Sequence, residues 1–277
     1  MPLLVNTNIA SINAQRAFSG SQRIVERSYA QLASGSRITK AADDAAGLSI
    51  SENLKSRIRG YKQAQRNAQD AISVVQIAEG GLNEISNIIS RLRELGVQAA
   101  SDNLGDTERG FVNKEVTQLK EEVERIAQST RFGDIHVLNG SGKEFEFQVD
   151  INNDDFVDRI KFDAGQTEAT ATALGVDGFD FSQAEGARSA LDTIEAAQTK
   201  VNGFRANLGA IQNRLISTDD NLGVGVENLS AANSRIRDTD VAASAAELTK
   251  GNILLQATAS VLAQANQFPG VALKLLS

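Results

Sequence analysis

The sequence lacks cysteine and tryptophan altogether, and it has only two prolines and one histidine among its 277 residues. Without cysteine there can be no disulfide, thiolate metal site, iron–sulfur cluster or cysteine nucleophile. The one histidine, His136, excludes a multi-histidine metal site and leaves little general-base capacity near neutral pH. Aromatic residues make up only 5% of the chain, against 41% hydrophobic residues overall, which favours long helices that pack through small side chains.

Basic charge and long apolar runs are scarce as well. The formal net charge of −7 argues against nucleic acid as a partner, because a nucleic-acid-binding protein needs a basic face. No apolar run approaches the ~20 residues that a membrane-spanning helix needs. Residues 1–8 contain neither the basic nor the apolar segment of a cleaved secretory signal. We therefore expect that the protein, if it leaves the cell, is exported without a cleaved signal peptide.

Apolar residues in the second half follow one another at alternating steps of four and three, the pattern of a coiled-coil seam. The seam runs from Ala190 to Ile236, with weak positions at Thr218 and Gly225. A helix over this range is about 70 Å long at ~1.5 Å per residue. A compact globule of this chain length has a diameter of only roughly 50 Å. The pattern predicts a mainly α-helical fold, an elongated coiled-coil or helical-bundle rod.

The first half supplies partners for this seam. A second four-three series covers residues 54–75 and continues in a shifted phase through residues 82–92. The shift falls beside Gly80 and Gly81, which predicts a bend or local overwinding of the helix. Residues 112–126 form a third helical series after a polar loop, so we expect an antiparallel bundle.

A different pattern covers residues 132–186, which we assign to a β-hairpin region. Residues 144–149 alternate between polar and apolar side chains, and residues 157–162 do so less cleanly. A polar turn separates the two runs. The region is predicted to contain a β-hairpin followed by an irregular, acidic connection.

Both ends of the chain carry apolar residues at heptad-like spacing. The predicted packing positions are Ile9, Ile12, Phe18, Val25 and Leu32 near the N-terminus, and Leu248, Leu255 and Leu262 near the C-terminus. On the C-terminal segment the four-three series also includes Ala245 and Ala259. We expect the terminal segments to pair with each other and with other copies, and to stay disordered until a partner covers them. The predicted domains are a terminal coiled-coil polymerisation domain, 1–42 plus 237–277, and a helical rod domain, 43–236.

Candidate chemical sites are few. The first three ligand positions of a calcium-binding EF-hand loop are matched by Asp150, Asn152 and Asp154. Asp155 then stands where that loop needs glycine, and Lys161 stands where it needs glutamate, so a solvated β-turn is the better interpretation. His136 has no cysteine or second histidine to complete a ligand set. We predict no enzyme activity, no metal and no cofactor.

A more specific pattern surrounds Asp43 and Asp44, which by themselves are typical of helix N-caps. Residues 32–35 read Leu-Ala-Ser-Gly, and residues 37–48 read Arg-Ile-Thr-Lys-Ala-Ala-Asp-Asp-Ala-Ala-Gly-Leu. Together they resemble the N-terminal signature of bacterial flagellin. Further segments are similar to the same family, in the same order and in both terminal thirds: 5–11, 91–100, 208–215, 234–240, 252–256 and 262–267.

The resemblance implies a structural subunit of the bacterial flagellar filament, in a short form without outer variable domains. It implies termini that pair as a coiled coil around a central channel, and export through the flagellar secretion apparatus with a chaperone on the C-terminal segment. Hook-associated proteins and cap proteins are implied as further partners. A hook–filament junction protein with the same paired-terminus design remains the alternative.

In some flagellins the wall helices carry a site that an animal innate immune receptor reads. Arg91, Leu95 and Glu115 match the pattern of that site. The same three residues would also fit a role in subunit packing. Both interpretations stay open at the level of the sequence.

Overall fold

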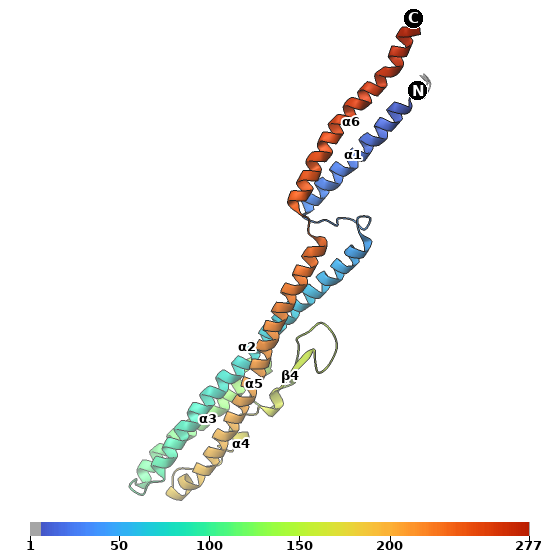
Figure 1. Ribbon diagram of the computed structural model, residues 1–277. Helices are drawn as coiled ribbons and strands as arrows, with labels where there is room; N and C mark the ends of the chain where they lie inside the picture. The colour runs from blue at the N-terminus through green and yellow to red at the C-terminus, as the bar shows by residue number, and fades with distance from the viewer. Residues whose placement is uncertain (1–6, 277) are drawn as a thin grey trace. The chain divides into compact units, whose positions relative to one another are not determined.

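The computed structural model describes residues 7–276, with side chains for residues 7–267. Positions 1–6 and 277 of the predicted terminal domain lie outside the described residues. The helices are α1 (Ile9–Ser34), α2 (Ala45–Ala99), α3 (Asp106–Ser129), α4 (Ala171–Leu174), α5 (Ala184–Arg237) and α6 (Val241–Leu276). The remaining elements are β1 (Arg131–Phe132), β2 (Ile135–His136), β3 (Glu144–Gln148), β4 (Arg159–Asp163) and the 3-10 helix η1 (Ala164–Gln166) (Figure 1). The predicted mainly α-helical fold with a small β-hairpin region is confirmed.

The chain divides into two compact units. We call Met1–Arg57 with Asn228–Ser277 the terminal unit, and Ile58–Glu227 the central unit. Among the described residues, no helix combines the length and the hydropathy needed to cross a membrane.

In the terminal unit, α1 and α6 run antiparallel along each other (Figure 1). Asn8 begins α1 by accepting a hydrogen bond from the Ser11 N–H at 3.0 Å, and its Nδ2 donates to the Ala265 carbonyl at 2.7 Å. At the other end α1 stops at Gly35, whose φ of 67° is the left-handed conformation of a helix C-cap. Each helix therefore has a partner within the same chain, and the expected pairing of the terminal helices is confirmed.

In the central unit, α5 follows the predicted seam. Ile194, Val201 and Leu208 are almost completely buried, and the seam continues through Leu222. The facing seam on α2 runs from Ala68 to Leu92 without a change of phase, so the shift predicted beside Gly80 and Gly81 is wrong. The reason is that small residues at 71 and 78, both fully buried, carry the four-three spacing through this stretch.

Gly81 has a different role, because it lets the loop after α3 approach α2 closely. A Cβ on Gly81 would lie 2.7 Å from Cδ1 of Leu138 and 2.8 Å from Oγ1 of Thr130. Real Cβ atoms do not tolerate such distances without displacement of a neighbour. A Cβ on Gly80 would meet no atom within 4 Å.

The turn between α2 and α3 is closed by a buried arginine. Arg109 of α3 donates from Nε to the Ala99 carbonyl at 3.0 Å and from Nη2 to the Ser101 carbonyl at 2.8 Å. Ala99 is the last residue of α2, so its carbonyl has no partner inside the helix. The Ser101 carbonyl lies in the turn itself and also accepts a longer hydrogen bond from the Leu104 N–H at 3.5 Å. The predicted hairpin of helices is confirmed, and Arg109 fixes its turn.

The predicted β-hairpin consists of β3 and β4, antiparallel, with Phe147 opposite Ile160. Phe162 of β4 is 1% exposed, and its ring stacks on that of Phe145 with 5.9 Å between centroids. The acidic connection that follows is less irregular than expected, since it contains η1 and α4. Thr170 caps α4 by accepting a hydrogen bond from the Ala173 N–H.

Candidate assembly and recognition surfaces

The seam between α1 and α6 alternates large and small side chains. Its large positions are half-buried: Phe18, Val25, Leu32, Leu248, Leu255 and Leu262. Its small positions are buried: Ala14, Ser21, Ser28, Ser244, Gly251 and Ala265. Six of the eight predicted packing residues therefore face the partner helix of their own chain.

The small positions of α6 lie one residue before those that the sequence pattern indicated. Ser244 and Gly251 are buried, whereas Ala245 and Ala259 are exposed. Gly251 shows why the small residue matters, because a Cβ there would lie 2.9 Å from Cγ2 of Val25. A large side chain of one helix thus fits against a small residue of the other, which fixes their register.

Large apolar side chains also cover the outside of this helix pair. Ile9 and Ile12, the other two predicted packing residues, are 58% and 49% exposed. Further large apolar residues of the pair are also exposed: Ile24, Tyr29, Val241, Ile253, Leu254 and Val261. Exposed apolar side chains in such number on two neighbouring helices are typical of an interaction surface.

Residues 35–44, which connect α1 to α2, are held by backbone and charge contacts within the terminal unit. Arg37 N–H donates to the Arg237 carbonyl at 2.7 Å, and Thr239 N–H donates to the Gly35 carbonyl at 3.1 Å. Asp43 accepts hydrogen bonds from the Lys40 N–H and from the N–H and hydroxyl of Thr39.

The two aspartates of this connection have different roles. Asp44 caps α2 by accepting a hydrogen bond from the Gly47 N–H at 2.8 Å, as predicted. Asp43 instead closes the turn before it, where Arg27 of α1 lies 3.7 Å away. The bonds from Lys40 and Thr39, with the positive charge of Arg27, lower the pKa of Asp43.

In the central unit, the structure brings together two of the three predicted receptor residues. Arg91 of α2 and Glu115 of α3 form an ion pair at 3.0 Å, and Arg91 also pairs with Glu94 at 2.8 Å. These two carboxylates raise the pKa of Arg91. Leu95 does not join them on the surface, because it is only 2% exposed and lies in the hydrophobic core.

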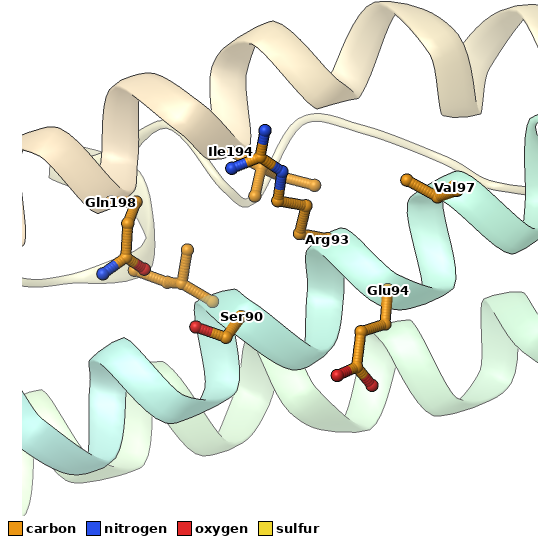
Figure 2. A pocket seen from close by; sticks show the side chains of 7 residues that line it. Ser90, Arg93, Glu94, Val97, Ile194 and Gln198 are labelled. Atoms are coloured by element: carbon orange, nitrogen blue, oxygen red, sulfur yellow. The ribbon is translucent and has the colours of Figure 1, made fainter.

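An open groove of about 510 Å³ lies beside this pair, between α2 and α5. It is lined by Ile89, Ser90, Arg93, Glu94, Val97, Ile194 and Gln198. Figure 2 shows Arg93 extending from α2 towards Ile194 of α5, while Glu94 points away towards α3. The groove has apolar walls and a charged rim that includes the Arg93–Glu195 pair at 3.4 Å, so it suits docking rather than bond-making chemistry.

The EF-hand-like segment is a turn whose acidic groups bind its own backbone. Asp154 accepts hydrogen bonds from the N–H groups of Phe156 and Val157, and these bonds lower its pKa. Asp150 accepts one from the Ile151 N–H. Within the described residues, no group of three or more acidic or histidine side chains is placed to hold a metal ion. His136 lies in β2, and its buried Nδ1 has no hydrogen-bond partner in the part of the chain that the structure describes.

One exposed apolar pair was not predicted. Phe156 and Val157, in the turn between β3 and β4, are 87% and 65% exposed. In the sequence Val157 belonged to the second, irregular strand pattern, and Phe156 stood next to an acidic run. Only the position of the turn shows that both side chains point to solvent.

Comparison with known proteins agrees with this architecture. Residues 5–143 match the model of the bacterial flagellin N-terminal helical region, and residues 191–276 match that of the bacterial flagellin C-terminal helical region. The chain is 40% identical over 274 residues to a flagellin of Halalkalibacterium halodurans, covering 99% of this chain and 100% of that protein. It is 38% identical over 288 residues to the flagellar filament 30.7 kDa core protein of Treponema maltophilum, covering 99% of this chain and 100% of that one.

Among solved structures, the crystal structure of Bacillus cereus flagellin is similar, with a TM-score of 0.51 and 30% identity. The similarity covers 61% of this chain and 94% of that one. Two family models at the two ends, relatives that align over their whole length, and a matching helical fold lead to one conclusion. This chain belongs to the bacterial flagellin family.

Proposed function

We propose that the exposed apolar faces of α1 and α6 are the surfaces through which this chain, a structural subunit of the bacterial flagellar filament, polymerises. The observation that carries the proposal is a difference in exposure between the inner and outer faces of the helix pair. The seam residues are already covered within the chain, whereas Ile9, Ile253 and Val261 are more than half exposed.

Growth of a filament requires a contact between subunits that can repeat along the polymer without closing into a ring. When the patch of one subunit binds a different patch of the next, the contact is heterologous and can propagate as an open helix. The apolar residues outside the seam belong to both α1 and α6, so the pair offers two different patches. Burial of a fully exposed large apolar side chain contributes about 1.5–3 kcal/mol.

Seeded growth of purified chain on filament fragments tests this directly. The double variant Ile253→Ser, Val261→Ser removes two large side chains from α6 without touching the seam. We expect the critical concentration for elongation to rise by at least about tenfold, the factor for each 1.4 kcal/mol lost. Pelleting and electron microscopy measure the polymer.

The matched control is Asn252→Ser, Ala263→Ser, two exposed positions of the same helix outside the seam. It should elongate like the unchanged chain, and all three proteins should have the same helical content. Elongation of the Ile253, Val261 variant at an unchanged critical concentration would contradict the proposal. Growth of the unchanged chain on seeds also separates a filament subunit from a hook–filament junction protein, which does not propagate.

The domain assignment and the further partners are part of the proposal. Residues 1–42 and 237–277 would form the polymerisation domain, and residues 43–236 the rod. Between β4 and α5 lie only η1, α4 and short loops, which fits a short form without outer domains. Export without a cleaved signal peptide through the flagellar secretion apparatus, with a chaperone on the apolar C-terminal segment, is proposed from the family. So are contacts with hook-associated and cap proteins.

Recognition by an animal innate immune receptor is proposed for Arg91 and Glu115, with Leu95 supporting them from the core. What supports it is the exposed ion pair, with side chains 49% and 46% exposed, beside an open groove. The double variant Arg91→Ala, Glu115→Ala should abolish receptor activation by the monomer. Arg125→Ala, Glu122→Ala, an exposed pair on α3 alone, is the control.

A further inference from the structure

The sequence contains two Asn-Gly pairs, which the fold places in opposite backbone settings. Asn139-Gly140 lies in the loop between β2 and β3, and Asn202-Gly203 lies inside α5. We propose that Asn139 is a site of spontaneous deamidation, in which the Gly140 nitrogen attacks the side-chain amide and aspartate or isoaspartate replaces asparagine. Asn202 is its protected counterpart.

The side-chain carbonyl of Asn139 is polarised by two hydrogen bonds. Its Oδ1 accepts hydrogen bonds from the Ser141 N–H at 3.1 Å and from the Ser141 hydroxyl at 2.7 Å. The bond to the Ser141 N–H folds the side chain back over the Gly140 peptide. Two donors on this oxygen withdraw electrons from Cγ and stabilise the negative charge that develops on Oδ1 when a nucleophile adds.

The attacking nitrogen is free and unobstructed. Within the described residues, the Gly140 N–H has no hydrogen-bond acceptor. Gly140 carries no side chain to hinder the approach, and its φ of 74° is a conformation that other residues rarely adopt. The loop therefore holds both reacting atoms without committing the nitrogen to secondary structure.

The reaction needs only water. The Gly140 nitrogen loses its proton to solvent and forms a bond to Cγ of Asn139. The bond from Cγ to Nδ2 then breaks, and the NH2 group takes up one proton from water and leaves as ammonia. The resulting succinimide ring is opened by water at either carbonyl, which gives aspartate or isoaspartate.

Asn202-Gly203 provides a control inside the same molecule. Both residues are exposed, so access of water does not protect them. The Gly203 N–H belongs to the hydrogen-bond ladder of α5, which also holds the Gly203 nitrogen away from the side chain before it. Among the described residues, the one hydrogen bond that the Asn202 side chain accepts is longer, from Gln198 Nε2 at 3.3 Å.

Conversion at Asn139 changes the contacts of its loop. The Nδ2 that donates to Gln128 of α3 at 3.3 Å is replaced by an acceptor. The new carboxylate also adds charge close to Glu168, whose carboxyl carbon lies 2.7 Å from where a Cβ on Gly140 would be. The first change weakens the attachment of the loop to α3, and the second weakens its packing against the segment between η1 and α4.

Peptide mass spectrometry of the full chain, aged at pH 8 and 37 °C, tests the inference. Trypsin releases the two sites in separate peptides, 132–143 and 201–205, each with a single asparagine. Ageing in ¹⁸O-labelled water marks conversion that precedes digestion. In the folded chain we expect Asn139 to convert at least about tenfold faster than Asn202, a barrier difference of about 1.4 kcal/mol.

Two comparisons make the result decisive. In urea the two rates should converge, because α5 no longer protects Asn202. The variant Ser141→Ala should slow conversion of Asn139 in the folded chain by about tenfold, the effect of one lost hydrogen bond, and leave the rate in urea unchanged. Equal rates for Asn139 and Asn202 in the folded chain, or slower conversion of Asn139 folded than unfolded, would overturn the proposal. An unchanged folded rate in Ser141→Ala would overturn the role of the hydroxyl.

Discussion

Adjacent glycines in α2 should respond in opposite directions to the same substitution. Gly80→Ala places a methyl group in open space, whereas Gly81→Ala places it 2.7 Å from Cδ1 of Leu138. Leu138 is fully buried, and Thr130, the other neighbour, uses its hydroxyl to bond the Ile126 carbonyl at 2.7 Å. Neither neighbour can move away freely, so the helix or the loop must shift.

The magnitudes follow from two opposing effects. Replacing glycine by alanine inside a helix stabilises it by about 0.8–1 kcal/mol, and this gain is common to both variants. Overpacking a buried site costs about 1–3 kcal/mol, and only Gly81→Ala incurs this cost. Because the helix-propensity gain cancels in the comparison, the difference between the two variants measures the close approach of the loop to α2.

Urea unfolding followed by circular dichroism at the helix band measures both variants. We expect Gly80→Ala to unfold at higher urea than the unchanged chain, and Gly81→Ala to be about 1–3 kcal/mol less stable than Gly80→Ala. Equal m-values would show that the unfolding reaction itself is unchanged. If Gly81→Ala were as stable as Gly80→Ala, the reasoning about loop contact would be refuted.

Two further perturbations address the turn of the helical hairpin and the α1–α2 connection. Arg109→Met removes the donor to the Ala99 carbonyl and the shorter of two hydrogen bonds to the Ser101 carbonyl, and should cost about 2–3 kcal/mol in urea unfolding, whereas the exposed Arg125→Met should cost under about 0.5 kcal/mol. A stability loss no larger than that of the control would show that Arg109 is not the clamp of the turn. Asp43 has a lowered pKa in the folded chain. The stability that its carboxylate gives to the α1–α2 connection is therefore complete above the pKa of about 3.9 of an unfolded aspartate, and it is lost as pH falls through the folded pKa. Proteolysis of residues 35–44 should therefore increase below about pH 4, and Asp43→Asn should be cleaved readily at neutral pH; resistance of that variant would contradict the assignment.

The long helices could be predicted from the sequence because their apolar residues are large enough to mark one face. The seam of α5 was predicted residue by residue, and so were Leu82, Ile85, Ile89 and Leu92 on its partner face of α2. Ile72 was predicted to lie in that seam, but Ala71 is the buried residue there. Where alanine, serine or glycine forms the seam, the sequence pattern no longer distinguishes the buried face from the exposed one, since these residues occur on every face of a helix. This explains both the false phase shift near Gly80 and the one-residue error in α6, where Ser244 and Gly251 are the buried positions.

The predicted receptor residues illustrate a second limit. Similarity of motif identified Arg91, Leu95 and Glu115 together, but only the fold separates the exposed ion pair from the buried leucine. Spacing along α2 places residues 91 and 95 on neighbouring turns of one face. Whether a residue on that face is exposed or buried depends on how α3 packs against α2. The periodicity of α2 alone carries no information about this packing.

The alternation of large and small residues has a consequence for how the terminal helices can serve two purposes at once. A seam in which Leu248 and Leu255 alternate with the small residues Ser244 and Gly251 is narrow, because the small residues let the helices approach closely, as Val25 does at Gly251. A narrow seam leaves the remaining circumference of α6 free, and there Ile253 and Val261 are exposed rather than used for intrachain packing. Replacing Gly251 by a larger residue should separate α1 from α6 without removing the exposed apolar side chains. Replacing Ile253 should weaken attachment to a neighbouring subunit without disturbing the contact between α1 and α6. On the proposed function, register within the chain and attachment to a neighbour are therefore set by different residues of the same two helices.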